Sequence, residues 1–87
     1  MYCIPSEADV ARIENNFKYH PPYGDQRERY ETIRDYAKGF AHLLVQNCTT
    51  SRELSIALTH LEETVMWANA AIARNEPIPT VTAVGKK

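Results

Sequence analysis

The chain has 87 residues, enough for one domain with a thin hydrophobic core. Its 10 Lys and Arg residues nearly balance its 11 Asp and Glu residues, and this excludes the broad positive surface that polymeric nucleic acids or anionic membranes require. No apolar run approaches the ~18 residues of a membrane span, and the first residues do not form a signal peptide. Cys3 and Cys48 lie at no metal-ligand spacing. We therefore expect a cytoplasmic protein with reduced thiols, no metal and no cofactor.

A short first helix is predicted over residues 5–17. Ser6 followed by Asp9 resembles an N-cap with an acidic residue in the first turn, where the acid favours the positive end of the helix dipole. Val10, Ile13 and Phe17 then fall on one apolar stripe.

The next segment, residues 19–24, reads Tyr-His-Pro-Pro-Tyr-Gly and cannot continue the helix, because paired prolines remove hydrogen-bond donors and extend the preceding residue. Its aromatic rings precede a second helix, on which Arg34 and Lys38 lie one turn apart. Aromatic faces stack on nucleobases, and helix N-termini and basic side chains hold phosphates. Taken alone, however, these residues are more typical of a packed loop and a solvated basic face than of a ligand site.

Two long helices are predicted over residues 26–47 and 51–74. Asp25 with Glu28 marks the first start and Thr50 with Glu53 the second, the latter as a capping box. The connection between them is short, so they should fold back as an antiparallel hairpin. Apolar residues recur every three or four positions at Tyr30, Ile33, Ala37, Phe40 and Leu44 in one helix, and at Leu54, Leu58, Leu61, Val65, Ala68 and Ile72 in the other.

The last helix has a second apolar face. At about 100° per residue, Ile56 and Trp67 point away from the Leu54–Ile72 seam. A short first helix covers them poorly, so we expect them to contact neighbouring subunits of a homo-oligomer; the alternative is two scattered surface hydrophobes. The predicted fold is therefore all-α, a single helical domain over residues 1–87, with residues 76–87 as a flexible tail or an extended arm on another subunit.

Signatures of an enzyme are missing from the sequence. It has no Gly-rich phosphate loop, no His-Glu-x-x-His and no Cys-x-x-Cys. Glu62 and Glu63 are adjacent and diverge on a helix, while His42 and His60 lie on different predicted helices without an obvious partner. We therefore expect a binding protein rather than an enzyme. A second hypothesis is a structural helical hairpin that oligomerises or binds a host protein.

Residues 16–38 and 50–76 resemble a phage protein family, the anti-CBASS cyclic-oligonucleotide sponges of the anti-CBASS protein two type. The most specific strings are Met-Trp-Ala-Asn-Ala at residues 66–70 and Ala-Arg-Asn-Glu at residues 73–76. The resemblance covers residues 14–76 and leaves both ends of the chain unmatched. It implies a hexamer in the cytoplasm of an infected bacterium. There it would bind cyclic dinucleotides between subunits without cleaving them, and in some members cyclic trinucleotides in separate pockets. Removal of these second messengers would keep a cell-killing effector inactive.

The resemblance also implies site residues. In the dinucleotide pocket of this family a tyrosine stacks on a base and a basic side chain on the next helix contacts the ligand. Tyr19 fits the first role, and Arg34 or Lys38 the second, with the choice between them open. The implied dinucleotide pocket comprises Tyr19, His20, Gln26, Arg34 and Lys38, and the implied trinucleotide pocket comprises Arg74 and Asn75.

Overall fold

The computed structural model describes residues 4–77. These residues form three helices and no strand: α1 (Glu7–Asn16), α2 (Gln26–Asn47) and α3 (Arg52–Asn75). The prediction of an all-helical fold is confirmed, and the helix bounds differ from the predicted ones by at most two residues. Cys3 and most of the predicted tail lie outside the described residues.

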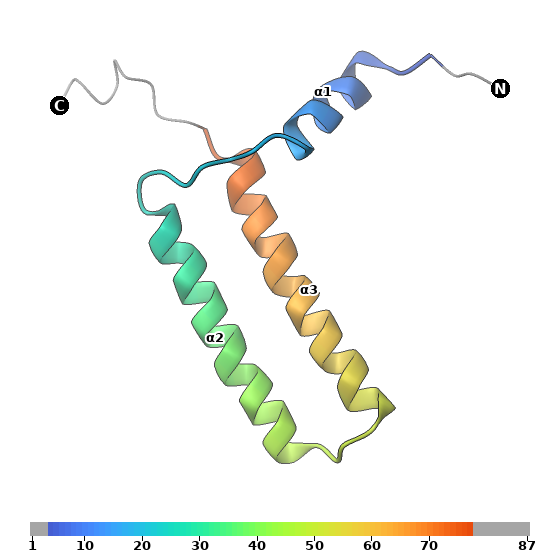
Figure 1. Cartoon of the computed structure of the whole chain (residues 1–87), viewed down its shortest axis with the longest axis vertical. Coiled ribbons are helices and arrows are strands. Elements are labelled where there is room, and N and C mark those ends of the chain that lie inside the picture. The colour runs from blue at the N-terminus through green and yellow to red at the C-terminus, as the bar shows by residue number, and fades with distance from the viewer. Residues whose placement is uncertain (1–3, 78–87) are drawn as a thin grey trace.

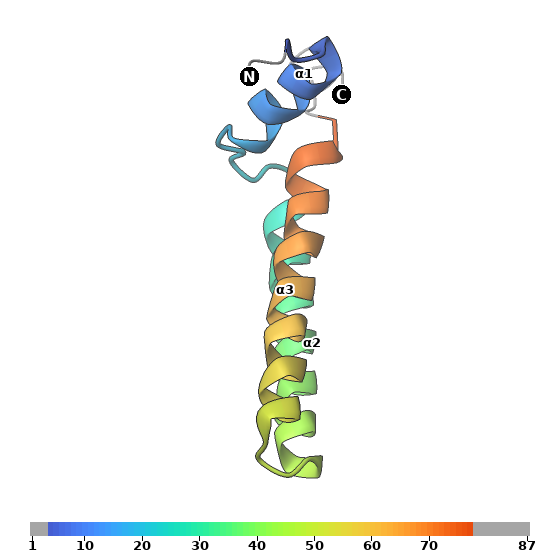
Figure 2. The ribbon, with the colours of Figure 1, turned by 90° about the vertical axis from the view of Figure 1, so that its right-hand side faces the viewer.

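Helices α2 and α3 run side by side in opposite directions, and α1 lies beyond the open end of this hairpin, near the end of α3 (Figure 1). Turned by 90°, the two long helices overlap and make a single layer (Figure 2). Packing between helices is concentrated in the α2–α3 pair. Helix α1 therefore covers neither broad face of the hairpin.

The helix starts use partly different caps from those predicted. Ser6 caps α1 as expected, because its hydroxyl accepts from the Asp9 amide at 3.0 Å. Asp25 occupies the N-cap position of α2 but makes no capping bond, since its carboxylate binds the Arg29 side chain at 3.1 Å instead. The predicted Thr50 capping box is wrong. Ser51 is the N-cap of α3, and its hydroxyl accepts from the Leu54 amide at 3.2 Å.

The seam between α2 and α3 follows the predicted spacing. Leu54 is buried at 8% exposure, and the other predicted seam residues of α3 are half-buried. On α2 the predicted seam residues are half-buried except Phe40, which is exposed on the flank. Among residues 4–77 only Leu54 and Gln26 are buried in the single chain. A single layer of two helices thus buries very few side chains by itself.

Large apolar side chains remain exposed on every helix. The predicted outward position of Trp67 is confirmed, with 66% of the residue accessible, and Ile56 is also exposed. The α1 stripe of Val10, Ile13 and Phe17 is uncovered as well. On α2, the exposed residues Tyr36, Phe40 and Leu43 share the flank opposite Arg34 and Lys38, because helical residues three and four apart lie on one face.

No helix within residues 4–77 has both the length and the apolar character needed to cross a membrane. In the same part of the chain, no three side chains of His, Cys, Asp or Glu lie close enough together to bind a metal ion. Cys48 is a free, exposed thiol at the end of α2.

Candidate functional site

An open groove of about 460 Å³ lies at the open end of the hairpin, where the loop after α1 meets the ends of α2 and α3. Four of the predicted site residues, Tyr19, His20, Arg34 and Arg74, line this groove together. Three separate segments of the chain therefore contribute to it. The rest of its lining is Asn16, Lys18, Tyr30, Asn69, Ala70 and Ala73.

The groove carries positive charge only, although the chain as a whole has a net charge of −1. Lys18, Arg34 and Arg74 line it, and no Asp or Glu is among its lining residues. None of these three cations belongs to an ion pair in the described part of the chain. Their donors are therefore available to an anion, and charge-assisted bonds to phosphate are among the stronger hydrogen bonds in proteins.

The aromatic residue of the groove is Tyr19, which is 80% exposed. Its ring is thus largely uncovered and can stack on a planar group. The neighbouring His20 is half-buried, and its Nε2 donates to the Asn15 carbonyl at 2.7 Å. The Asn15 side chain in turn donates from Nδ2 to the Arg74 carbonyl at 3.0 Å, near the end of α3. These two bonds fix the start of the loop against α3.

Lys38 lies in an adjoining groove of about 390 Å³ between the two long helices. Arg34 lines both grooves, so the two basic residues form one continuous strip along α2. The second groove is lined by the seam residues Ala37, Leu58 and Leu61, and also by Glu62. Arg34 lines the Tyr19 groove, while Lys38 lies one turn farther along α2 and lines the second groove.

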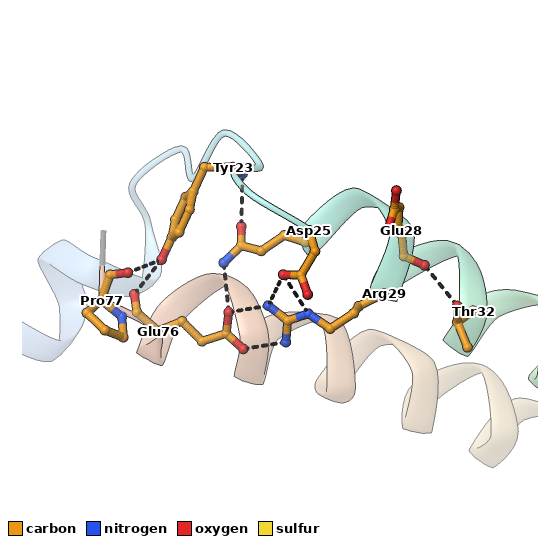
Figure 3. Close-up of polar contacts among 8 residues, drawn as sticks. Tyr23, Asp25, Glu28, Arg29, Thr32, Glu76 and Pro77 are labelled. Atoms are coloured by element: carbon orange, nitrogen blue, oxygen red, sulfur yellow. Dashed lines mark hydrogen bonds and ion pairs between the residues drawn. The ribbon is translucent and has the colours of Figure 1, made fainter. Parts of the chain in front are cut away.

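A second polar cluster ties the start of α2 to the end of α3, as Figure 3 shows. The Glu76 carboxylate accepts two bonds from the Arg29 guanidinium, at 2.7 and 2.8 Å, in a fork arrangement. It also accepts from Gln26 Nε2 at 3.0 Å. The Tyr23 hydroxyl donates to the main-chain carbonyls of Glu76, at 3.0 Å, and Pro77, while the Tyr23 amide donates to Gln26 Oε1 at 3.2 Å.

This cluster changes the acidity of both charged groups. The bonds from Arg29, and next from Gln26, lower the pKa of the Glu76 carboxyl from its ordinary value of 4.5 to about 2. The same bond, together with the nearby Asp25 carboxylate, raises the pKa of Arg29. Both side chains are therefore charged at every physiological pH.

The predicted residues Gln26 and Asn75 do not line the Tyr19 groove. Gln26 is only 2% exposed, and both ends of its amide are occupied within the cluster around Glu76. Asn75 is exposed, and its Nδ2 donates back to the Ala71 carbonyl at 3.1 Å. Arg74, which was predicted to serve a separate pocket, shares one groove with Tyr19 in the single chain.

Sequence analysis missed Lys18 and Asn69 in the groove, and Arg29 and Glu76 in the cluster. For Arg29 a local signal existed, since Asp25 lies four residues before it and such pairs commonly interact on a helix. Glu76 carried no such signal, because 47 residues separate it from Arg29.

The Glu76 cluster predicts how stability depends on pH. A carboxyl group whose pKa is lower in the folded state stabilises the fold above its ordinary pKa, and this contribution is lost as pH falls through the lower value. Glu76→Gln should therefore be less stable than wild type at pH 7, and the difference should shrink between pH 4.5 and 2. Urea unfolding followed by circular dichroism, at one protein concentration and several pH values, measures this difference.

Glu63→Gln is the matched control, because it makes the same change on α3 at an exposed contact, with His60 at 3.5 Å. It should differ little from wild type at pH 7. A Glu76→Gln variant as stable as this control at pH 7 would contradict a stabilising role for the cluster.

Comparison with known proteins assigns the chain to a family. The model of the family described as "Acb2/Tad1, hairpin domain" matches residues 9–73, which include all of α2, nearly all of α3 and the loop that carries Tyr19. Neither the search of curated proteins nor the search of solved structures gave a match. Since the family model covers most of the 87 residues, the chain belongs to the Acb2/Tad1 hairpin-domain family, which is the anti-CBASS protein 2 / Tad1 family.

Proposed function

We propose that this protein is a phage-encoded sponge that binds cyclic dinucleotides in the Tyr19 groove and sequesters them without cleavage. Bound ligand would then be withheld from the effector of CBASS immunity in the bacterial cytoplasm. The observation that carries the proposal is the groove itself, which joins the exposed Tyr19 ring to three cations and no carboxylate. A base and a phosphate of one small ligand match these two kinds of group.

The groove also favours a compact ligand over a polymer. Its volume of about 460 Å³ is in the range of small-molecule sites. Polymeric nucleic acids bind through long basic surfaces, and the net charge of −1 offers none. We propose cyclic trinucleotides as a second class of ligand. Arg74 of each chain in the oligomer would then bind a phosphate of the trinucleotide.

We further propose that the chain works as a homo-oligomer, with a hexamer as the expected form. Two observations support an oligomer: the single chain buries very few residues, and apolar side chains such as Trp67 and Met66 on α3 are exposed. A second copy would remove these surfaces from water. A cyclic dinucleotide has approximate twofold symmetry, so a pocket at a twofold interface would present Tyr19 and Arg34 to it twice. The expected stoichiometry is one dinucleotide per two chains.

Trp67→Glu tests the assembly. Wild type should show several times the 9.9 kDa chain mass by light scattering at micromolar concentration. The variant should shift to smaller species, because an unpaired charge would enter an apolar contact. Gln46→Glu adds the same charge at an exposed polar position of α2 and should keep the wild-type mass. Wild-type protein that is monomeric under these conditions would contradict the proposed assembly.

The rival function is an interaction protein that uses the exposed apolar faces of the hairpin and binds no nucleotide. The exposed Trp67 and Phe40 favour it, since such patches often mark protein contacts. The two functions differ in what stabilises the protein. A cyclic dinucleotide at saturating concentration should raise the melting temperature of a sponge and leave that of the interaction protein unchanged.

Tyr19 gives the sharpest mutational test of the site. Tyr19→Ala should weaken cyclic dinucleotide binding about tenfold or more, because stacking on an aromatic ring contributes ~1–3 kcal/mol per base. Tyr19→Phe is the matched control and should retain most of the affinity, since it keeps the ring. Isothermal titration measures both. Unchanged affinity in Tyr19→Ala would remove the tyrosine from the site.

A further inference from the structure

We propose that Glu76, held by Arg29 and Gln26, is a positioning residue that anchors the Tyr19 loop to the end of α3 and so prepares the groove for its ligand. This inference rests on the proposed function for the identity of the ligand. The anchoring of the loop is a property of the free protein and is measurable without any ligand.

The loop is attached to α3 on both sides of Tyr19. On one side, His20 Nε2 donates to the Asn15 carbonyl, and Asn15 Nδ2 donates to the Arg74 carbonyl. On the other side, the Tyr23 hydroxyl donates to the Glu76 carbonyl at 3.0 Å. Between these attachments lie Pro21 and Pro22, whose backbone angles are already restricted. The loop thus has few ways to move while both attachments hold.

Glu76 connects the second attachment to α2. Its main-chain carbonyl accepts from Tyr23, and its carboxylate accepts from Gln26 Nε2 and from the Arg29 fork. Gln26 links the Glu76 carboxylate to the backbone of Tyr23, because its Oε1 accepts from the Tyr23 amide at 3.2 Å. The Tyr23 amide is therefore held by Gln26, which also binds the Glu76 carboxylate, and the Tyr23 hydroxyl is held by the Glu76 main-chain carbonyl. Figure 3 shows the bonds of the Tyr23 hydroxyl and of the Glu76 carboxylate.

Arg29, Gln26 and Glu76 are absent from the lining of the Tyr19 groove. Glu76 and Tyr23 instead border an adjoining hollow of about 430 Å³ behind the loop, which Tyr19, His20 and Arg74 also line. The three residues thus lie outside the groove, and Glu76 contacts the loop through the Tyr23 hydroxyl. Their effect on binding would come from a loop that is already ordered before the ligand arrives, which lowers the entropy lost on binding.

Hydrogen–deuterium exchange on the free, full-length chain tests the anchoring. In Glu76→Gln and Arg29→Lys, the hydrogen-bonded amides of Tyr23 and Gln26 should exchange about tenfold faster than in wild type, because local opening then costs less free energy. The hydrogen-bonded amides of Cys48 and Ser55, at the opposite end of the hairpin, should keep their wild-type rates, because local fraying there leaves the Glu76 cluster intact. The Glu63→Gln control should change neither set.

A double-mutant cycle then tests the effect on the ligand. Glu76→Gln should weaken binding of the probe, 3′,3′-cyclic GMP–AMP, about tenfold. In that background Tyr19→Ala should cost less affinity than it does in wild type, because a mobile tyrosine contributes less. A cluster that served stability alone would leave the cost of Tyr19→Ala unchanged.

The outcomes separate the two proposals. Faster loop exchange with a reduced Tyr19 effect supports the positioning role. Unchanged loop exchange, or equal acceleration at the opposite end of the hairpin, overturns it even if wild type binds the nucleotide. Wild-type protein that binds no cyclic dinucleotide overturns the proposed function, while the exchange data still decide whether Glu76 anchors the loop.

Discussion

The forked ion pair between Arg29 and Glu76 joins the two long helices at the end of the hairpin opposite their connecting loop. The hairpin itself has almost no buried core. The ion pair fixes the first turn of α2 against the residue that follows α3, at 2.7 and 2.8 Å. The groove lies at this same end, and its Arg34 comes from α2 while its Arg74 comes from α3. Any splaying of the two helices would separate these cations. The proposed positioning role of Glu76 rests on this arrangement.

A second constraint is the shortage of core. Two antiparallel helices in one layer bury a single seam, and each helix keeps its remaining faces toward solvent. Apolar residues on those faces, such as Trp67 and Leu43, would be costly in a protein that worked alone. Assembly would cover them and would bring together grooves from different chains. Folding, assembly and ligand binding are in this account parts of one equilibrium, in which each step stabilises the others.

Sequence reasoning predicted those parts of the structure that depend on local periodicity. The seam from Leu54 to Ile72 followed from apolar residues at helical spacing, and the hairpin followed from the short connection before α3. The α3 cap was wrong by one residue, because Thr50 and Ser51 are adjacent and both can cap. Asp25 makes no capping bond because Arg29, one turn later, competes for its carboxylate.

Within the candidate site, the residues came from the family resemblance, and their contact with a ligand stays a prediction. Two of them, Tyr19 and Arg34, line one groove. Gln26 was predicted as a ligand contact, yet its amide is occupied by Tyr23 and Glu76. No local pattern links Gln26 to Glu76, since 50 residues separate them and only the folded hairpin brings them together.

In the proposed function the positively charged groove binds a cyclic dinucleotide and leaves it intact. The decisive experiment is calorimetric titration of the wild-type protein with 3′,3′-cyclic GMP–AMP, followed by heat denaturation and chromatography of the released ligand. We expect saturable binding at one ligand per two chains and full recovery of the unaltered cyclic dinucleotide. Absence of binding, or recovery of a linear or shortened product, would contradict it.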